Sequence, residues 1–346
     1  IENFQVLGKP NLFFGVTAGN LDSLIANYTS EKRKRKTDSY SENGTPGLRP
    51  DRASLVYCNC LKQCYPDSII VLGGIEASLR RLTHYDYWSD KLRRSILFDS
   101  RANILVYGMG EKALISIAER VKNLAPLTDI PNTAYISNKE PAGNNLTLES
   151  YETLQKDKKA YAQSAMIYAQ EIAKKEPRRV IQACQNRYTV IEPPKIVTSK
   201  ELDDIYHLPF TRLAHPKYQQ QIPAYSFVKQ SVVSHRGCYG GCSFCSLGAH
   251  QGKYIVSRTA NSIISEIKNI VSKQPDFKGT ILDVGGPSAN MFGSYCLSKT
   301  GCSRTSCLYP NICKNLKHQQ LKHLDILKDI LKLPNIKNVF INSGIR

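Results

Sequence analysis

The sequence has no apolar run long enough to cross a membrane and no pattern of an export signal. We therefore expect a cytoplasmic protein that has no membrane partner. Acidic residues are scarce too, since 29 Asp and Glu stand against 47 Lys and Arg, a formal net charge of +18. A basic surface attracts polyanions such as RNA, although a lysine-rich composition has the same effect without any specific partner. The charge makes RNA a candidate substrate, and the oligomeric state stays open.

The 11 cysteines are many for a cytoplasmic chain, and most of them lie in tight groups. Disulfide-stabilised domains are usually smaller and carry an export signal, so grouped cysteines indicate metal binding instead. The first group consists of Cys58, Cys60 and Cys64. It fits a metal site, but we favour small core residues with a surface thiol.

The length of 346 residues exceeds one ordinary core and predicts two domains with a connector between them. Residues 1–148 alternate short apolar runs with helical patterns, as an α/β domain does. Residues 149–228 begin as a long helix and continue as an extended connector that prolines interrupt. Residues 229–346 repeat a strand–loop–helix rhythm. Three such steps do not close a barrel, so we expect further units beyond the last residue.

Short apolar runs predict the strands, and apolar stripes at helical spacing predict the helices. The predicted strands cover residues 12–16, 54–57, 69–72, 104–107 and 188–191, then 231–233, 280–284 and 338–342. The predicted helices cover residues 114–121, 149–176, 263–271 and 324–331.

The strongest signal is the spacing Cys-x3-Cys-x2-Cys of Cys238, Cys242 and Cys245, in the loop after a predicted strand. A four-iron cluster that only three cysteines bind keeps one iron open, and that iron can chelate S-adenosylmethionine through its amino and carboxylate groups. An electron from the cluster then breaks a carbon–sulfur bond and yields a 5′-deoxyadenosyl radical. We therefore predict a [4Fe-4S] cluster, with Phe244 as an apolar wall near the adenine.

Three alternatives compete with the cluster. Structural zinc would need a fourth ligand, which His235 or His250 could supply. A disulfide is disfavoured by the expected compartment. Chance cysteines are disfavoured by the spacing and by its place after a strand.

A second group of cysteines lies between the next predicted strand and its helix. Loops at this end of the strands build the active sites of barrel enzymes. Four cysteines in so short a loop suit zinc or an auxiliary iron–sulfur cluster, and their loose spacing leaves the metal open. The group consists of Cys296, Cys302, Cys307 and Cys313.

These motifs resemble the radical S-adenosylmethionine (radical SAM) superfamily, whose signature is the same Cys-x3-Cys-x-aromatic-Cys. The likeness narrows to the uncharacterised YgiQ-type family and extends over nearly the whole chain. The segments that carry it are 13–20, 49–52, 73–81, 84–90, 234–245, 250–252, 257–258 and 283–290.

The resemblance implies a Rossmann-like, cobalamin-binding-like α/β domain followed by a partial TIM-type (β/α) radical SAM barrel. It also implies a [4Fe-4S] cluster, S-adenosylmethionine and a reductant such as flavodoxin or ferredoxin, but no known substrate. Modification of RNA or protein is one version of the reaction. The Asp-x-His-x-x-Gly motif of many cobalamin-dependent relatives is not found, which favours a scaffold-like domain; cobalamin bound without a protein ligand stays open.

Three further residues are candidates for cofactor binding. Gly285 and Gly286 follow the second barrel strand, where the superfamily keeps a Gly-Gly-Glu-like motif that receives the amino group of S-adenosylmethionine. Here Pro287 replaces the acidic residue, and a simple tight turn is an equal alternative. Arg258 would face the substrate or the methionine carboxylate, or else it is an ordinary helix-entry residue. The rival function is a zinc-stabilised nucleic-acid-binding protein without radical chemistry.

Overall fold

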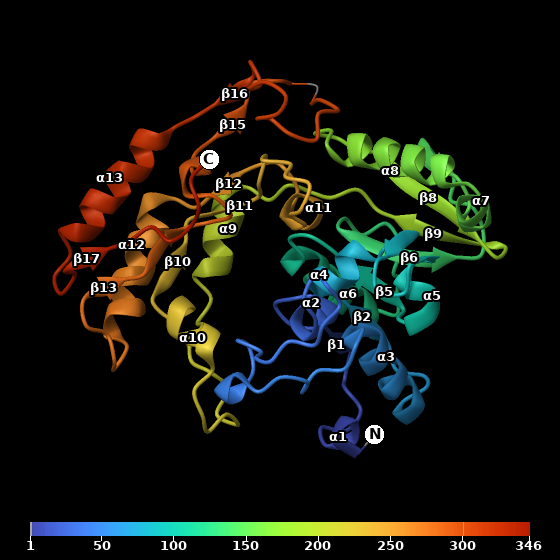
Figure 1. The fold of residues 1–346 in the computed structure, drawn as a ribbon, viewed down its shortest axis with the longest axis horizontal. Coiled ribbons are helices and arrows are strands. Elements are labelled where there is room, and N and C mark those ends of the chain that lie inside the picture. The colour runs from blue at the N-terminus through green and yellow to red at the C-terminus, as the bar shows by residue number, and fades with distance from the viewer. Residues whose placement is uncertain (1, 300) are drawn as a thin grey trace. The chain divides into compact units, whose positions relative to one another are not determined.

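The computed structural model describes residues 2–299 and 301–346, and within these the chain divides into two compact units (Figure 1). The first unit contains the residues up to Arg35, Gly47–Lys195 and a short segment that ends at Arg304. The second unit contains Lys36–Pro46, Ile196–Lys299 and Thr305–Arg346. Each unit has a hydrophobic core of its own.

The first unit is built on a seven-stranded mixed sheet of order β1-β2-β5-β6-β9-β8-β7. β1, β2 and β5 run parallel, β6, β9 and β8 pair antiparallel, and β7 is parallel to β8. The strands are β1 (Phe14–Val16), β2 (Ile70–Leu72), β5 (Ile104–Val106), β6 (Thr133–Ser137), β9 (Arg187–Ile191), β8 (Arg179–Cys184) and β7 (Asn145–Leu148).

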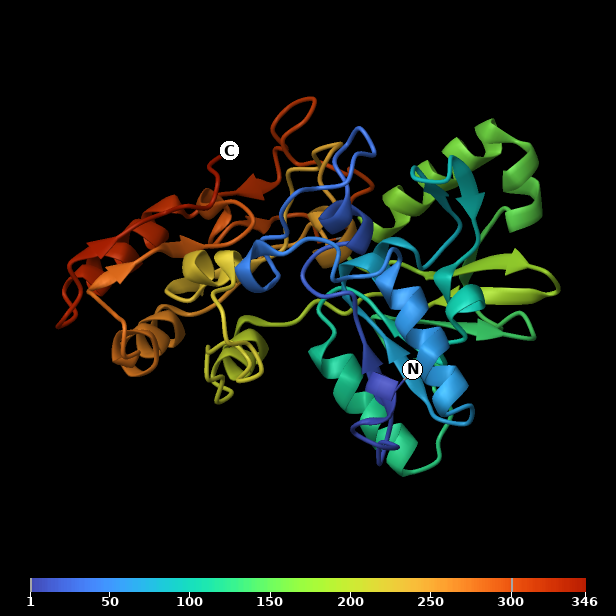
Figure 2. The same ribbon diagram turned by 60° about the horizontal axis from the view of Figure 1, so that its bottom comes forward.

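The central strands β2 and β5 are buried on both faces of the sheet, since successive side chains of a strand point to opposite faces. Ile70 and Leu72 pack in one cluster with α3 (Ala53–Cys64) and α5 (Ile96–Ser100). Val71 packs on the other face with α6 (Glu111–Lys122). Figure 2 shows α3 in blue and α6 in blue-green on either side of the strands.

The α/β class of this unit is confirmed, but its strand order differs from the Rossmann-like prediction. A doubly wound sheet reverses its order at a switch point, where ligands bind. Within the described residues, β1, β2 and β5 follow one another in one direction, and the next strand is antiparallel.

Two local predictions also differ from the structure. Residues 54–57 were expected to form a strand because Leu55, Val56 and Tyr57 favour strands, but they lie in helix α3. The expected connector from residue 149 instead begins inside the first unit. Its first part forms α7 (Tyr151–Lys156) and α8 (Lys158–Ile172), then β8 and β9 of the sheet. The helix predicted at 149–176 and the strand predicted at 188–191 are therefore confirmed, but hydrogen bonding of β8 and β9 in the sheet makes them part of the first unit.

The second unit has strands and helices where the sequence predicts them, but the strand predicted at 280–284 is divided into β13 and β14, and the strand predicted at 338–342 ends at Val339. β10 (Ser231–Val233) pairs in parallel with β14 (Asp283–Gly285), and β13 (Thr280–Ile281) pairs in parallel with β17 (Asn338–Val339). Their apolar side chains form one core with α12 (Ala260–Asn269) and α13 (Gln320–Leu331). These are successive βα steps, and the loops that follow the strands lie at a common edge.

The remaining elements are short. They are α1 (Glu2–Gln5), α2 (Ser23–Asn27), η1 (Glu42–Gly44), α4 (Gly74–Leu79), β3 (His84–Asp86), β4 (Lys91–Arg93), α9 (Ser199–Tyr206), α10 (Pro223–Val228), β11 (His235–Arg236), α11 (Leu247–Gln251), β12 (Val256–Ser257), η2 (Val271–Lys273), η3 (Ala289–Met291), β15 (Tyr295–Cys296) and β16 (Leu316–Lys317). None of the described helices has both the length and the apolar character needed to cross a membrane.

Candidate functional site

The three central cysteines lie in a loop between β11 and α11, residues 237–246, which we call the cysteine loop. The amide of Cys238 donates to the carbonyl of Gly252 at 3.0 Å, and the amide of Cys245 donates to the carbonyl of Cys242 at 3.0 Å. Gly241 has φ +64°, and a Cβ there would lie 2.7 Å from Cβ of Ser306. A glycine is therefore required where the loop turns between its first two cysteines.

The three thiols of the cysteine loop share one electrostatic environment. The pKa of Cys238 is raised, mainly by burial, and the electrostatic effect of Cys242 and Cys245 raises it as well. The guanidinium of Arg346 contacts Sγ of Cys242 and interacts electrostatically with Cys238 and Cys245 as well. The three thiols and this guanidinium therefore act electrostatically on one another.

This donor set fits an iron–sulfur cluster. Three thiolates in one short loop would repel one another, and a bound cationic metal removes that penalty. No group of three or more described His, Cys, Asp or Glu side chains is arranged around a point that a single metal ion could occupy. A cluster makes a different demand, because each cysteine binds its own iron and the sulfurs need not converge on one atom.

Gly285 and Gly286 lie at the end of β14, beside the strand that precedes the cysteine loop. Gly285 pairs with Val233 of β10, and its carbonyl accepts from the amide of Ser234 at 2.7 Å. A Cβ at Gly286 would lie 2.6 Å from Cε1 of His235. The two glycines therefore permit close packing at this edge. Burial lowers the pKa of His235 to about 4, so its ring is neutral at pH 7.

Phe244 and Arg258 differ in exposure. Phe244, in the cysteine loop, is 86% exposed. The side chain of Arg258 is fully buried: its Nη1 donates to the carbonyl of Val233 at 2.9 Å and pairs with Glu266. Its guanidinium also stacks over the ring of Tyr206, 4.2 Å from the centroid. These contacts hold Arg258 in the wall of the second unit.

The second cysteine group is attached to the cysteine loop. The amide of Cys307 donates to the carbonyl of Tyr239 at 3.0 Å, and the amide of Cys313 donates to the carbonyl of Cys307 at 2.8 Å. Cys307 and Cys313 belong to the same apolar cluster as Cys238. Cys296 lies in the hairpin of β15 and β16, and Cys302 lies in the short segment that groups with the first unit.

The cysteines of helix α3 follow the favoured interpretation. Cys58 is buried in the core of the first unit, and burial raises the pKa of its thiol to about 12. Cys60 and Cys64 are half-buried, and a spacing of four residues places them on one helical face, away from Cys58. The helix therefore separates these thiols.

Sequence reasoning missed Arg346 and the residues that hold it. The Arg346 amide donates to Oδ1 of Asn290 at 3.1 Å, and the side-chain amide of Asn290 donates to the carbonyl of Arg346. The only signal in the sequence is that residues 342–346 follow a predicted strand, as the cysteine loop does. Such a position is where a barrel presents site residues.

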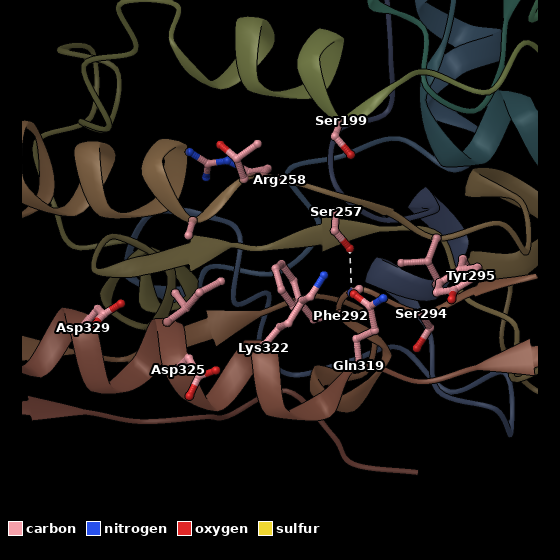
Figure 3. A pocket seen from close by; sticks show the side chains of 15 residues that line it. Ser199, Ser257, Arg258, Phe292, Ser294, Tyr295, Gln319, Lys322, Asp325 and Asp329 are labelled. Atoms are coloured by element: carbon pink, nitrogen blue, oxygen red, sulfur yellow. Dashed lines mark hydrogen bonds between the residues drawn. The ribbon is translucent and has the colours of Figure 1, made fainter.

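The second unit also has a cavity of about 540 Å³ beside α13 (Figure 3). Lys322, Asp325 and Asp329 line it from α13, and the backbone amide of Gly293 donates to Oγ of Ser257 at its wall, at 2.8 Å. The described residues along this wall include no cysteine. The cavity is thus separate from the sulfurs of the cysteine loop.

The comparisons with known proteins agree with the motifs. Residues 1–231 match the family described as Radical SAM N-terminal. A UPF0313 protein of Bacteroides thetaiotaomicron is 44% identical over 368 residues, which covers 100% of this chain and 59% of the relative. A UPF0313 protein of Thermotoga petrophila is 43% identical over 348 residues (98% and 61%), and one of Methanocella arvoryzae is 44% identical over 352 residues (99% and 59%).

Among solved structures, the chain is similar to the radical S-adenosylmethionine methyltransferase TsrM from Kitasatospora setae, with tryptophan substrate and a SAM analog bound. The identity is 14%, the TM-score is 0.46, and the match covers 97% of this chain and 44% of TsrM. A TM-score at this level is too low to assign a fold.

The chain therefore belongs to the radical SAM N-terminal family. Its curated relatives are UPF0313 proteins, which confirms the predicted YgiQ-type membership. The chain spans about 60% of the length of these relatives (59% and 61%).

Proposed function

We propose that the chain is the part of a radical SAM enzyme that binds its [4Fe-4S] cluster, through Cys238, Cys242 and Cys245. The observation that supports this most directly is that the three cysteines lie in one loop and interact electrostatically with one another and with the guanidinium of Arg346, which contacts Sγ of Cys242. When bound, the cluster would supply the electron that cleaves S-adenosylmethionine to a 5′-deoxyadenosyl radical.

The protein residues of the site have separate roles in this proposal. Three thiolates hold the cluster and leave one iron for the methionyl group of S-adenosylmethionine. Gly285 and Gly286 offer the backbone that faces its amino group, and Phe244 offers an apolar surface to its adenine. Arg258 keeps the wall in place through Glu266 and Tyr206. It acts as a structural residue.

Full-length protein purified without oxygen and reconstituted with iron and sulfide tests this function. We expect about four irons per chain and release of 5′-deoxyadenosine after reduction with dithionite in the presence of S-adenosylmethionine. Cys238→Ala, Cys242→Ala and Cys245→Ala should each abolish the product. Cys60→Ser is the matched control, because Cys60 lies on helix α3 of the other unit, and it should leave iron and product unchanged. Zinc alone in the preparation would support the rival nucleic-acid-binding function.

We also propose that Cys296, Cys307 and Cys313 of the second unit form a second metal site; the sequence spacing adds Cys302 to this group. Its support is the attachment of Cys307 and Cys313 to the cysteine loop and the pairing of Cys296 with Leu316 on the neighbouring hairpin. Metal analysis of the variant that lacks all three cysteines of the cysteine loop gives the test. Retained iron or zinc would confirm the second site and identify its metal, and a metal-free variant would refute it.

The substrate class and the partners follow from charge and chemistry. A net charge of +18 favours a polyanion such as RNA as the molecule that is modified, and a flavodoxin or ferredoxin as the reductant. Binding of RNA and of a neutral peptide at several salt concentrations would separate these substrates, since only RNA binding should weaken steeply with salt. For the first unit we propose a scaffold without cobalamin, and a cobalamin titration followed by absorbance checks it.

A further inference from the structure

The segment after β17 is fixed to the end of β14 by several hydrogen bonds. Oδ1 of Asp283 accepts from the amides of Asn342 and Ser343, at 2.9 and 3.2 Å. The carbonyl of Gly344 accepts from the amide of Ala289 at 2.8 Å. Together with the paired contacts between Asn290 and Arg346, these bonds set the register of the segment residue by residue. The backbone of Arg346 is therefore held at a defined place.

From that place the side chain of Arg346 reaches the cysteine loop. Its Nη1 contacts Sγ of Cys242, and its charge also acts on Cys238 and Cys245. A Cβ at Gly240 would lie 3.0 Å from this Nη1, so the glycine leaves the space that the guanidinium occupies. The contact thus depends on three elements: the loop, the end of β14 and the segment after β17.

We propose that Arg346 is a positioning residue that donates a charge-assisted hydrogen bond to the Cys242 thiolate and makes the bound cluster easier to reduce. The inference rests on the proposed function, because it concerns a cluster held by the cysteine loop. Reduction adds one negative charge to a cluster that already has three thiolates. A cation that is hydrogen-bonded to one of the sulfurs stabilises the reduced state more than the oxidised state.

A guanidinium could instead bind the carboxylate of S-adenosylmethionine, and the two roles make different demands. A hydrogen bond to the sulfur acts without S-adenosylmethionine, so it alters the reduction potential of the cluster alone. A contact with the carboxylate alters the affinity for S-adenosylmethionine. It leaves unchanged the reduction potential that the cluster has when S-adenosylmethionine is absent. The observed contact with Cys242 favours the first role.

An EPR-monitored redox titration of the reconstituted full-length protein, without S-adenosylmethionine, tests the proposal. For Arg346→Gln we expect the ratio of reduced to oxidised cluster at a fixed potential to fall about fivefold, the size expected for an exposed charge pair. In Arg346→Lys this ratio should fall less, because lysine keeps the charge but not the forked donor. Lys337→Gln should match the wild type, since Lys337 is exposed and precedes β17, at the other end of the strand.

The outcomes separate this inference from the proposed function. A wild type that binds no iron overturns both. If the cluster has the same reduction potential in the wild type and in Arg346→Gln, the role of Arg346 is overturned and the proposed function stands. A higher Kd for S-adenosylmethionine in that variant would then assign the carboxylate role. If Arg346→Gln does not retain iron, Arg346→Lys decides: a potential below the wild type supports the hydrogen bond, and an equal potential refutes it.

Discussion

Helix α3 and the cysteine loop each carry three cysteines within a short stretch, but the two backbones place their thiols differently. On α3, the rise and rotation of the helix fix Cys58 toward the core and Cys60 and Cys64 on another face. In the cysteine loop, a left-handed glycine turns the backbone between Cys238 and Cys242, and the thiols share one environment. A close spacing of cysteines indicates metal binding only where the backbone is free to bring the sulfurs together.

The largest expected difference between the two regions is in bound iron. Replacement of Cys242 by alanine should remove a cluster ligand, so that the reconstituted protein loses its cluster EPR signal and most of its iron. Cys64→Ala on α3 should keep both, because a half-buried thiol on a helix has no part in the cluster. Iron analysis and EPR of the two variants, prepared in parallel, measure the difference. Equal iron loss in both would break the distinction between loop and helix.

A second comparison concerns one buried histidine in each unit. Burial lowers the pKa of His84 and of His235 to about 4, below the unfolded value of 6.5. The unfolded state therefore binds the proton first as the pH falls. The stability from each neutral ring is fully present above pH 6.5 and is lost progressively toward pH 4, by up to about 3 kcal/mol each.

Urea unfolding of the cluster-free protein at pH 7 and pH 4.5 measures this loss. His84→Gln and His235→Gln should each make the free energy of unfolding of the unit that contains the residue less dependent on pH. A pH dependence that both variants leave unchanged would show that other groups dominate acid unfolding.

The third prediction concerns close packing at the end of β14. Gly286→Ala places a Cβ against the ring of His235 and should lower the free energy of unfolding by about 1–3 kcal/mol. Gly15→Ala, in strand β1 of the first unit, is the control, because a Cβ there would meet nothing within 4 Å. Thermal unfolding of both variants gives the comparison. A tolerated Gly286→Ala would mean that the glycine serves only as a turn.

The smallest effect is expected at Cys58. With a pKa of about 12, its thiol is protonated at pH 8, and it is shielded in the core. Iodoacetamide should therefore leave Cys58 unmodified in the folded protein. Peptide mass spectrometry at increasing times measures this, and urea-unfolded protein is the control, in which Cys58 should react. Rapid alkylation of Cys58 in the folded state would place it outside the core.

Much of this architecture could be predicted from the sequence. The strands at 69–72 and 104–107 were predicted because parallel strands buried on both faces read as continuous apolar runs. Residues 54–57 were predicted as a strand but lie in helix α3, because β-branched and aromatic side chains also fit a helix that packs on a sheet. β7 was missed because Asn145 and Thr147 interrupt its apolar pattern.

The candidate site was predictable in its local part only. Cys238, Cys242 and Cys245 are close in sequence, so their spacing was enough. Arg346 reaches the same place through hydrogen bonds to residues more than fifty positions earlier, such as Asn290 at a separation of 56. A long-range register of this kind leaves no pattern in a single sequence.

The central claim is that three thiolates hold a four-iron cluster and leave one iron open. Mössbauer spectroscopy of the ⁵⁷Fe-reconstituted full-length protein, before and after addition of S-adenosylmethionine, tests it most directly. We expect a [4Fe-4S] spectrum in which one of the irons, and only one, changes when S-adenosylmethionine is added. A spectrum that S-adenosylmethionine leaves unchanged, or a preparation that takes up zinc and no iron, would contradict the account.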